Sequence, residues 1–235
     1  MSIEVEQLTK NYGDQKAIDN ISFKVNPGEV LGFLGPNGAG KSTTMKILSC
    51  FIPQTSGKVS VCGFDVTANS MEVRRNIGYL PEHNPLYLDH YVKESLEFIA
   101  GVHQIENKKR RIVEVIEEVG LTGEQHKKIG DLSKGYRQRV GLAQAIIHNP
   151  QVLIMDEPTS GLDPNQLIGI RKLIQELGKT KTVIFSTHIM QEVEAICSRV
   201  IIINRGKITA DDQLSNLYQN NNNKSLEDIF IALTN

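Results

Sequence analysis

Gly35-Pro-Asn-Gly-Ala-Gly-Lys-Ser42 is the stretch of this sequence that decides the fold. It matches the pattern G-x-x-x-x-G-K-[ST] at every fixed position. It follows a continuous apolar run at 30–34, typical of a buried strand, and leads into residues 41–48, which predict a helix ending before Pro53. Glycines in this setting let successive backbone N–H groups point inward, and a helix N-terminus adds a favourable dipole. We therefore predict an α/β fold with a loop that binds phosphate groups.

The last two residues of the loop carry chemistry of their own. Lys41 is expected to lie along the β- and γ-phosphates of a nucleotide, and the Ser42 hydroxyl is expected to ligate Mg²⁺. The alternative is a glycine-rich turn with a surface lysine. That alternative leaves the full match and its strand-helix context unexplained, so the sequence predicts a nucleotide-binding site.

A pair of acids forms the second half of the candidate site. Val152-Leu-Ile-Met-Asp156-Glu157 predicts an apolar strand that ends at the sheet edge where open α/β folds bind ligands. We expect Asp156 to reach the metal. Glu157 points elsewhere and is the candidate general base, which holds the attacking water in line with the γ-phosphorus. In a sequence without other motifs, an Asp-Glu pair after a strand is more often the N-cap of a helix. Together with the phosphate-binding loop at 35–42, the pair indicates nucleotide hydrolysis.

The remaining periodicity defines the fold class. Alternating residues at 3–25 predict a small antiparallel sheet, and residues 85–139 read as helical, with apolar positions of 108–119 on one face. Apolar runs at 152–155, 182–185 and 200–203, separated by helical stretches, predict a parallel sheet. We predict a P-loop NTPase with a mostly parallel central sheet, an N-terminal antiparallel β subdomain and an inserted helical subdomain. The expected division is a domain at 1–210, with helices at about 85–140, and a tail at 211–235 ending in a helix at 225–233.

Composition narrows the function classes. The chain has 26 Lys and Arg against 27 Asp and Glu, so its net charge of −1 argues against nucleic acid as a main partner. The longest stretch without a charged side chain, 140–155, is too short and too polar to span a bilayer. The start of the chain lacks the apolar run of a secretory signal, and its 3 cysteines show no metal-binding spacing. These features predict a cytoplasmic protein with reduced thiols.

Three further motifs separate this sequence from kinases and small GTPases. Leu132-Ser-Lys-Gly-Tyr-Arg-Gln-Arg139 opens a predicted helix, Ser160-Gly-Leu-Asp163 follows Glu157 closely, and His188 lies just past the strand at 182–185. With these motifs in this order, the sequence resembles the nucleotide-binding subunits of ABC transporters from about residue 3 to residue 207.

The resemblance implies a role for each matching residue. Tyr12 would stack on the adenine of ATP, although a cross-strand packing role remains open for it. Ser133 and Gly135 would grip the γ-phosphate bound to a second copy, Asp163 would signal across the dimer, and His188 would contact the γ-phosphate and position water. The residues that would cradle the triphosphate are Gly35, Pro36, Asn37, Gly38, Ala39, Gly40, Lys41, Ser42 and Thr43.

The resemblance also implies partners. Each ATP in this family lies between the phosphate loop of one subunit and the Ser133-type motif of another, so one chain holds two half-sites and is expected to act as a head-to-tail dimer. The dimer would bind ATP and Mg²⁺ and energise integral membrane permease subunits from the inner face of the cell membrane. The set Leu86, Tyr87, Leu88 and Tyr91 could dock such a permease or belong to the local core.

Two positions depart from the family pattern. Glu82 stands where the family usually has glutamine; its carboxylate could still ligate Mg²⁺, and its charge would repel the triphosphate when the metal is absent. Lys134 and Tyr136 stand in the signature motif where glycine and glutamine are commoner. Lys134 places a positive charge near that motif, and the sequence leaves its effect open.

A finer resemblance suggests what the transporter does. Residues 78–87 and the start Met1-Ser-Ile-Glu-Val resemble gliding-motility-associated ATP-binding subunits of Bacteroidetes, and residues 225–234 resemble the tail of ATPases that serve exporters. We therefore expect an exporter. The alternatives are a soluble ABC ATPase that acts on ribosomes or DNA, and a nucleotide-dependent regulator without transport.

Overall fold

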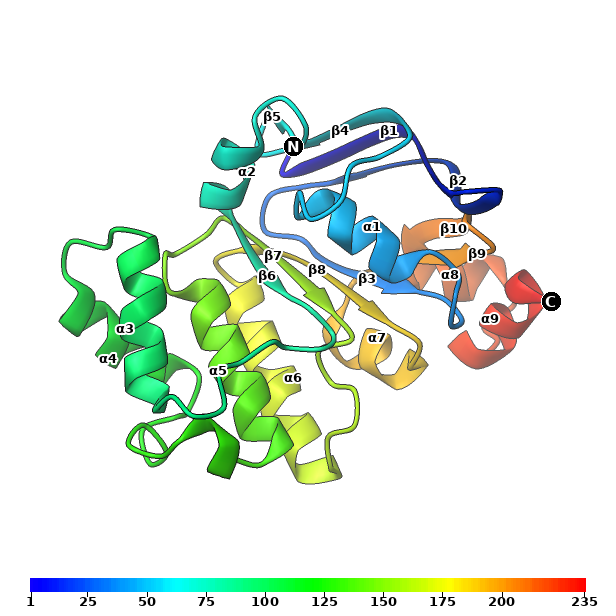
Figure 1. The fold of residues 1–235 in the computed structure, drawn as a ribbon. Coiled ribbons are helices and arrows are strands. Elements are labelled where there is room, and N and C mark those ends of the chain that lie inside the picture. Colours follow the sequence, from blue (N-terminus) through cyan, green and yellow to red (C-terminus); the bar gives the residue numbers. More distant parts are fainter.

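A six-stranded sheet runs through the middle of the molecule (Figure 1). The computed structural model describes all residues, 1–235. The strand order is β10-β9-β3-β8-β7-β6, and every neighbouring pair is parallel except β10 with β9. The strands of this sheet are β3 (Val30–Leu34), β6 (Ile77–Leu80), β7 (Val152–Asp156), β8 (Thr182–Thr187), β9 (Arg199–Asn204) and β10 (Lys207–Gln213).

The central strands are apolar along their whole length because both faces of the sheet are covered. In β7, Val152 and Ile154 pack into the core on one face, whereas Leu153 and Met155 pack into the core on the other. All of them are at most 1% exposed. A parallel sheet with helices on both faces requires such continuous apolar runs. The strands predicted at 30–34, 152–155, 182–185 and 200–203 are thereby confirmed.

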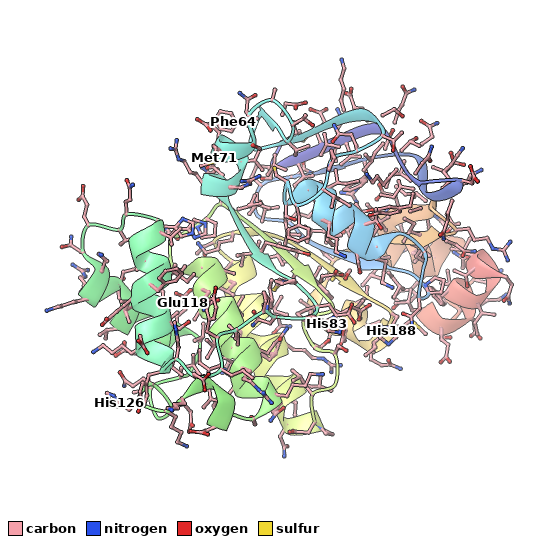
Figure 2. All side chains as sticks on the ribbon, in the orientation of Figure 1. Phe64, Met71, His83, Glu118, His126 and His188 are labelled. Atoms are coloured by element: carbon pink, nitrogen blue, oxygen red, sulfur yellow. The ribbon has the colours of Figure 1, made fainter.

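A second, antiparallel sheet covers one face of the first. Its order is β2-β1-β4-β5, and α1 (Lys41–Leu48) lies between the two sheets (Figure 1). Alternate residues of its first two strands, among them Ile3, Val5 and Ile18, face this layer and are buried. Phe64 and Met71 project outward at its far edge (Figure 2). Its strands are β1 (Ile3–Tyr12), β2 (Gln15–Val25), β4 (Ser56–Val61) and β5 (Phe64–Asp65).

Helices cover the opposite face and extend beyond it (Figure 1). In α4, Ile112, Val115 and Ile116 are buried as its periodicity predicts, and they belong to one continuous core with β7 and β8. The helices in this part of the chain are α3 (Val92–Val102), α4 (Lys108–Glu118), a 3₁₀ turn (Ile129–Asp131), α5 (Lys134–Ile146), α6 (Pro164–Gly178) and α7 (Met190–Ile196). The predicted fold class is confirmed by this architecture.

The segment at 77–85 begins with a strand that the sequence analysis did not predict. Its first part is β6, the edge strand of the parallel sheet, paired with β7 from Ile77 to Leu80. A strand of four residues that includes Gly78 and is followed directly by Pro81 gives too short a pattern to detect. The hairpin of β4 and β5 and the helix α2 (Ser70–Asn76) were not predicted either, since their sequences are largely polar.

The end of the chain packs back on the sheet. The helix predicted at 225–233 is α9 (Leu226–Thr234), whose N-cap Ser225 accepts a hydrogen bond from Asp228 N. The Asn204 side chain at the end of β9 donates to Thr234 O at 2.9 Å, which fixes the last turn of α9. The short helix α8 (Leu214–Asn220) links β10 to this region. None of the helices combines the length and the hydropathy needed to cross a bilayer.

Candidate nucleotide-binding site

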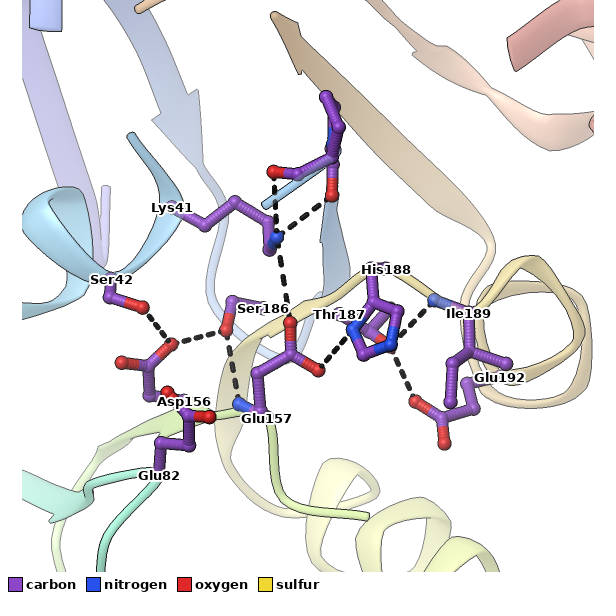
Figure 3. A network of polar contacts seen from close by, with 12 residues as sticks. Lys41, Ser42, Glu82, Asp156, Glu157, Ser186, Thr187, His188, Ile189 and Glu192 are labelled. Carbon is purple, nitrogen blue, oxygen red and sulfur yellow. Dashed lines mark hydrogen bonds and ion pairs between the residues drawn. The ribbon is translucent and has the colours of Figure 1, made fainter. Parts of the chain in front are cut away.

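The candidate site lies where the carboxyl ends of β3, β7 and β8 meet. Leu34 in β3 pairs with Thr187 in β8, and Asp156 in β7 pairs with Ser186 in β8. Because neighbouring parallel strands end at the same edge, the residues that follow each strand converge there. The sheet register therefore brings the loop at 35–42, the acids at 156–157 and His188 to one place (Figure 3).

The loop itself wraps tightly around the start of α1. Gly40, the N-cap of this helix, has φ 110, and a Cβ there would lie 2.6 Å from Ala17 O, so no other residue fits without strain. No side chain caps the helix, and its first turn contains no acid. The N–H groups at this end are therefore left to bind an anion, as the sequence predicts.

Lys41 is folded back over the loop. Its Nζ donates to Gly35 O at 2.8 Å and to Pro36 O at 3.2 Å, and it forms an ion pair with Glu157 Oε1 at 3.5 Å. The Lys41 side chain is 6% exposed. The ammonium group thus lies between the phosphate loop and the candidate general base.

Asp156 accepts two hydroxyl hydrogen bonds on one oxygen. Ser42 Oγ donates to Asp156 Oδ1 at 3.0 Å, and Ser186 Oγ donates to the same atom at 2.5 Å. Hydroxyl and carboxylate oxygens are the ligands that Mg²⁺ prefers, so the pair of Ser42 and Asp156 fits this ion. No group of three or more His, Cys, Asp or Glu side chains forms a complete cage for a metal ion. Mg²⁺ does not need one, because it keeps waters and takes further oxygens from phosphates.

Glu157 is held in a conformation that glutamate rarely adopts. Its φ is 49, in the left-handed region, and its N–H is bonded to both Ser186 O at 3.2 Å and Ser186 Oγ at 3.0 Å. The turned backbone directs the carboxylate away from Asp156. Its Oε2 accepts a hydrogen bond from His188 Nδ1 at 2.9 Å (Figure 3). The two acids that follow one another in the sequence therefore have separate surroundings.

A cavity of about 580 Å³ lies above these groups. Tyr12 lies at one end of it, half exposed beside the β1–β2 turn, with Lys10 Nζ 5.2 Å from the centre of its ring. This position is open to an aromatic ligand, and its only cross-strand partner is Gln15. The cavity is lined by Tyr12, Gln15, Ala17, Asn37, Gly38, Gly40, Lys41, Ser42, Thr43, Glu82, Glu157, Ser160 and His188.

Glu82 borders this cavity and a second one. The second cavity, about 660 Å³, also includes Ser42 and Asp156 and continues toward α3 and α5. The Glu82 side chain is 42% exposed and has only His83 Nδ1 nearby, at 4.0 Å. Tyr79, in the wall of the second cavity, has a buried hydroxyl without a hydrogen-bond partner. Burial, and then the charge of Asp156, raise the pKa of Tyr79, so the phenol stays protonated.

Ser133, Gly135 and Asp163 do not line the cavity above the phosphate loop. Ser133 is the N-cap of α5 and accepts from Tyr136 N and from the Gln166 side chain. Asp163 is the N-cap of α6 and accepts from two backbone N–H groups at 3.0 Å. The Lys134 side chain lies against Gly161 of the same chain. The geometry thus separates these residues from the ones at the loop.

Two kinds of comparison identify the family. The family model described as "ABC transporter" matches residues 18–160. The chain belongs to the ABC transporter family. The bacitracin transport ATP-binding protein BcrA of Bacillus licheniformis is 40% identical over 93% of this chain and 72% of its own length. The Nod factor export ATP-binding protein I of Burkholderia thailandensis is 36% identical over 89% of this chain and 70% of its own length.

Solved structures of ABC ATPases have the same fold. An ATP-binding subunit of an ABC transporter matches with a TM-score of 0.90 and 28% identity over 100% of both chains. A dimeric ATP-binding cassette in a post-hydrolysis state, bound to ADP and Pi, matches with a TM-score of 0.81 and 26% identity over 90% of this chain and 98% of that one. This chain is an ATP-binding subunit of the ABC transporter type and an ATP hydrolase.

Sequence reasoning missed Ser186, the residue that ties this ABC site together. It donates to Asp156 and accepts from the Glu157 N–H group, and it is fully buried. One signal was available: it directly follows the predicted strand at 182–185, which ends at the same sheet edge as Asp156. A serine at the end of a buried strand gives no pattern by itself, so its importance depends on the register of β7 with β8.

Proposed function

We propose that this chain is the ATP-hydrolysing subunit of an ABC exporter, and that it acts as a head-to-tail dimer on separate membrane permease subunits. The observation that carries the proposal is the convergence of the loop at 35–42, Glu157 and His188 on one cavity, with Asp156 hydrogen-bonded to Ser42 beside it. A peripheral position at the inner face of the cell membrane is part of the same proposal.

The contacts support one mechanism for hydrolysis. The loop N–H groups and Lys41 bind the triphosphate, and Tyr12 stacks on the adenine. Ser42, Asp156 and Glu82 supply oxygen ligands for Mg²⁺, which neutralises phosphate charge when it is bound. Glu157 accepts a proton from the attacking water, because its carboxylate is turned away from the metal ligands toward the cavity. His188 holds the carboxylate of Glu157 and faces the same cavity.

The dimer is proposed from the separation of two sets of residues. Ser133 and Gly135 lie at the start of α5, outside the cavity that holds the phosphate loop. The N–H groups of Lys134 and Gly135, in the first turn of that helix, have no capping partner and suit a phosphate bound to a second copy. A related cassette is dimeric. Two copies related by a two-fold axis would complete two equivalent sites, with Asp163 near the shared surface.

The second cavity is the proposed docking site for the permease. Its wall includes Lys46, Arg74 and Gln144, and aromatic side chains lie exposed around its rim or close by, among them Phe51 and Tyr87. The sequence analysis named four residues that could dock a permease. Of these, Leu86 packs on the core, whereas Tyr87, Leu88 and Tyr91 are exposed. An amphipathic cytoplasmic segment of a membrane subunit would cover this surface.

The proposed function includes a division of the chain into two parts. The first is a nucleotide-binding domain at 1–210 with a helical subdomain at about 85–140, and the second is a tail at 211–235.

Export is favoured by the similarity to the Nod factor export ATP-binding protein I. Gliding motility is a narrower proposal, and it rests only on the resemblance of residues 1–5 and 78–87. A soluble ATPase acting on ribosomes or DNA has no supporting feature here: the chain has one phosphate loop and a net charge of −1.

The proposal is tested by purifying the tagged chain from its own cells after mild cross-linking. We expect an integral membrane permease to co-purify from the membrane fraction, and the complex to hydrolyse ATP. A Lys41→Ala variant should still recover the permease but not hydrolyse ATP. Recovery with ribosomes or DNA, and no membrane subunit, would contradict the transport proposal.

A further inference from the structure

A buried carboxylate lies directly behind His188. Glu192, in the first turn of α7, is fully buried, and its Oε2 accepts a hydrogen bond from Thr187 Oγ1 at 2.6 Å. Its other oxygen, Oε1, is buried without a hydrogen-bond partner. An acid in this position costs free energy, because water would otherwise solvate both of its oxygens. The hydrogen bond from Thr187 compensates only part of this cost, because it reaches one of the two oxygens.

Thr187 is fixed by three hydrogen bonds. Its Oγ1 donates to Glu192 and accepts from Ile189 N at 3.0 Å, while its backbone carbonyl accepts from Gly35 N at 3.3 Å. These bonds close the turn between β8 and α7 on both sides of His188 (Figure 3). They also join that turn to the first glycine of the phosphate loop.

The His188 ring depends on this turn for its position. Its side chain is 46% exposed, and its one polar contact is the hydrogen bond to Glu157 Oε2 at 2.9 Å. The backbone on either side of His188 must therefore be rigid if the ring is to meet Glu157.

We propose that Glu192 is a positioning residue for ATP hydrolysis. Through the Thr187 hydroxyl it fixes the turn that presents His188 to Glu157 and to the nucleotide. This inference rests on the roles of His188 and Glu157 under the proposed function. Glu192 touches neither the nucleotide cavity nor the reacting atoms.

The test compares variants that keep the hydrogen bond with variants that remove it. Glu192→Gln and Thr187→Ser keep an acceptor and a hydroxyl, so both should retain most of the wild-type kcat. Glu192→Leu and Thr187→Val remove the bond and should lower kcat about 10-fold or more, with the KM for ATP changed less than about 3-fold. Glu194→Gln is the matched control on α7, because Glu194 is bonded only to the Tyr218 hydroxyl at the surface.

A double variant separates positioning from general damage. In the His188→Ala background, Glu192→Leu should cause no further loss of kcat, because the residue it positions is already absent. If the two losses multiply, or if Glu192→Gln is as impaired as Glu192→Leu, the positioning role is wrong. If His188→Ala alone hydrolyses ATP normally, the proposed role of His188 fails first, and the inference falls with it.

A second readout does not need turnover. The nitrogen resonances of His188, assigned by difference from His188→Ala, report the Nδ1 hydrogen bond to Glu157 in the full-length chain. In Glu192→Leu and Thr187→Val we expect them to move toward those of a free imidazole, and in Glu192→Gln to stay at the wild-type position. Unchanged resonances in Glu192→Leu would overturn the proposal even where turnover is too slow to measure.

Discussion

At the scale of single residues, the adjacent acids Asp156 and Glu157 have different hydrogen-bond and ion-pair partners. Asp156 accepts from Ser42 and Ser186, whereas the Glu157 carboxylate contacts Lys41 and His188. The left-handed φ of Glu157 separates them. In an extended chain the two side chains would also point to opposite sides. The left-handed turn at Glu157 additionally brings its Oε2 within 2.9 Å of His188 Nδ1.

Replacing Glu157 by glutamine tests its role as general base. Glu157→Gln keeps the size of the side chain and removes the proton acceptor, so we expect kcat to fall by at least about 100-fold. ATP should still bind and should trap a dimer that light scattering can detect. Turnover close to that of the wild type would remove Glu157 from this role.

Ser186 offers a test of the groups behind the acids. Ser186→Ala removes the donor to Asp156 and one acceptor of the Glu157 N–H, so we expect kcat to fall about 10-fold. The free energy of unfolding should fall by about 1–2 kcal/mol. Ser95→Ala is the control, since Ser95 is also buried and hydrogen-bonded but lies in α3. An equal loss of turnover in both variants would show that burial, not contact with the acids, matters.

Glu82 gives a prediction about the metal. In Glu82→Gln the side chain no longer repels the triphosphate, so the variant should depend less steeply on Mg²⁺ than the wild type. Titrating Mg²⁺ at fixed ATP measures this, with Glu106→Gln, an exposed acid away from the cavity, as control. Superimposable titration curves for the wild type and Glu82→Gln would contradict it.

At the scale of elements, two histidines join α3 and α5 at the floor of the second cavity. The rings of His103 and His148 stack with centroids 3.9 Å apart and planes 2° apart. His148 Nε2 donates to Ile77 O at 2.8 Å, which ties the end of α5 to β6. Burial, and then the nearby His103, lower the pKa of His148 to about 4. Protonating either ring inside the folded protein is therefore unfavourable.

This stack predicts a pH dependence of stability. In the unfolded chain His148 titrates near 6.5, so between about pH 6.5 and 4 the unfolded state binds more protons than the folded state. The free energy of unfolding contributed by this group therefore falls as the pH falls through that window. Urea unfolding at several pH values should show a steeper acid loss for the wild type than for His148→Gln. His126→Gln, at the outer end of the helical region (Figure 2), should behave as the wild type.

The elements that sequence reasoning predicted are those with a strong local pattern, set either by burial or by a recognisable motif. Val30–Leu34 and Lys41–Leu48 were located because one is buried on both faces and the other follows a glycine loop. The edge strand at Ile77–Leu80 was missed because it is short and includes a glycine. Likewise Lys41, Asp156 and Glu157 belong to recognisable patterns, whereas Ser186 and Glu192 gain their meaning only from register and turn geometry.

At the scale of the whole molecule, the proposed two-fold arrangement predicts complementation. Lys41→Ala damages the phosphate loop, and Ser133→Arg damages the opposite half-site. In a head-to-tail pair of the two variants, one site carries both faults and the other is intact. An equal mixture should regain about a quarter of wild-type turnover, since half of randomly formed dimers are mixed and each has one good site.

The measurement is ATP hydrolysis by each variant alone and after mixing. Each variant alone should be inactive. Mixtures of each variant with the wild type serve as the reference that shows whether subunits exchange between dimers. A mixture as inactive as its components, despite proven exchange, would mean that Ser133 does not complete the site of a second copy.

The left-handed backbone at Glu157 has a consequence for how such a chain evolves. Holding a non-glycine residue there costs about 1–3 kcal/mol, and the acid is also buried. Glycine at this position would relieve the strain and raise thermal stability, but it would also remove the carboxylate that the proposed mechanism needs. A laboratory selection for thermal endurance alone would tend to discard the side chain proposed as the general base.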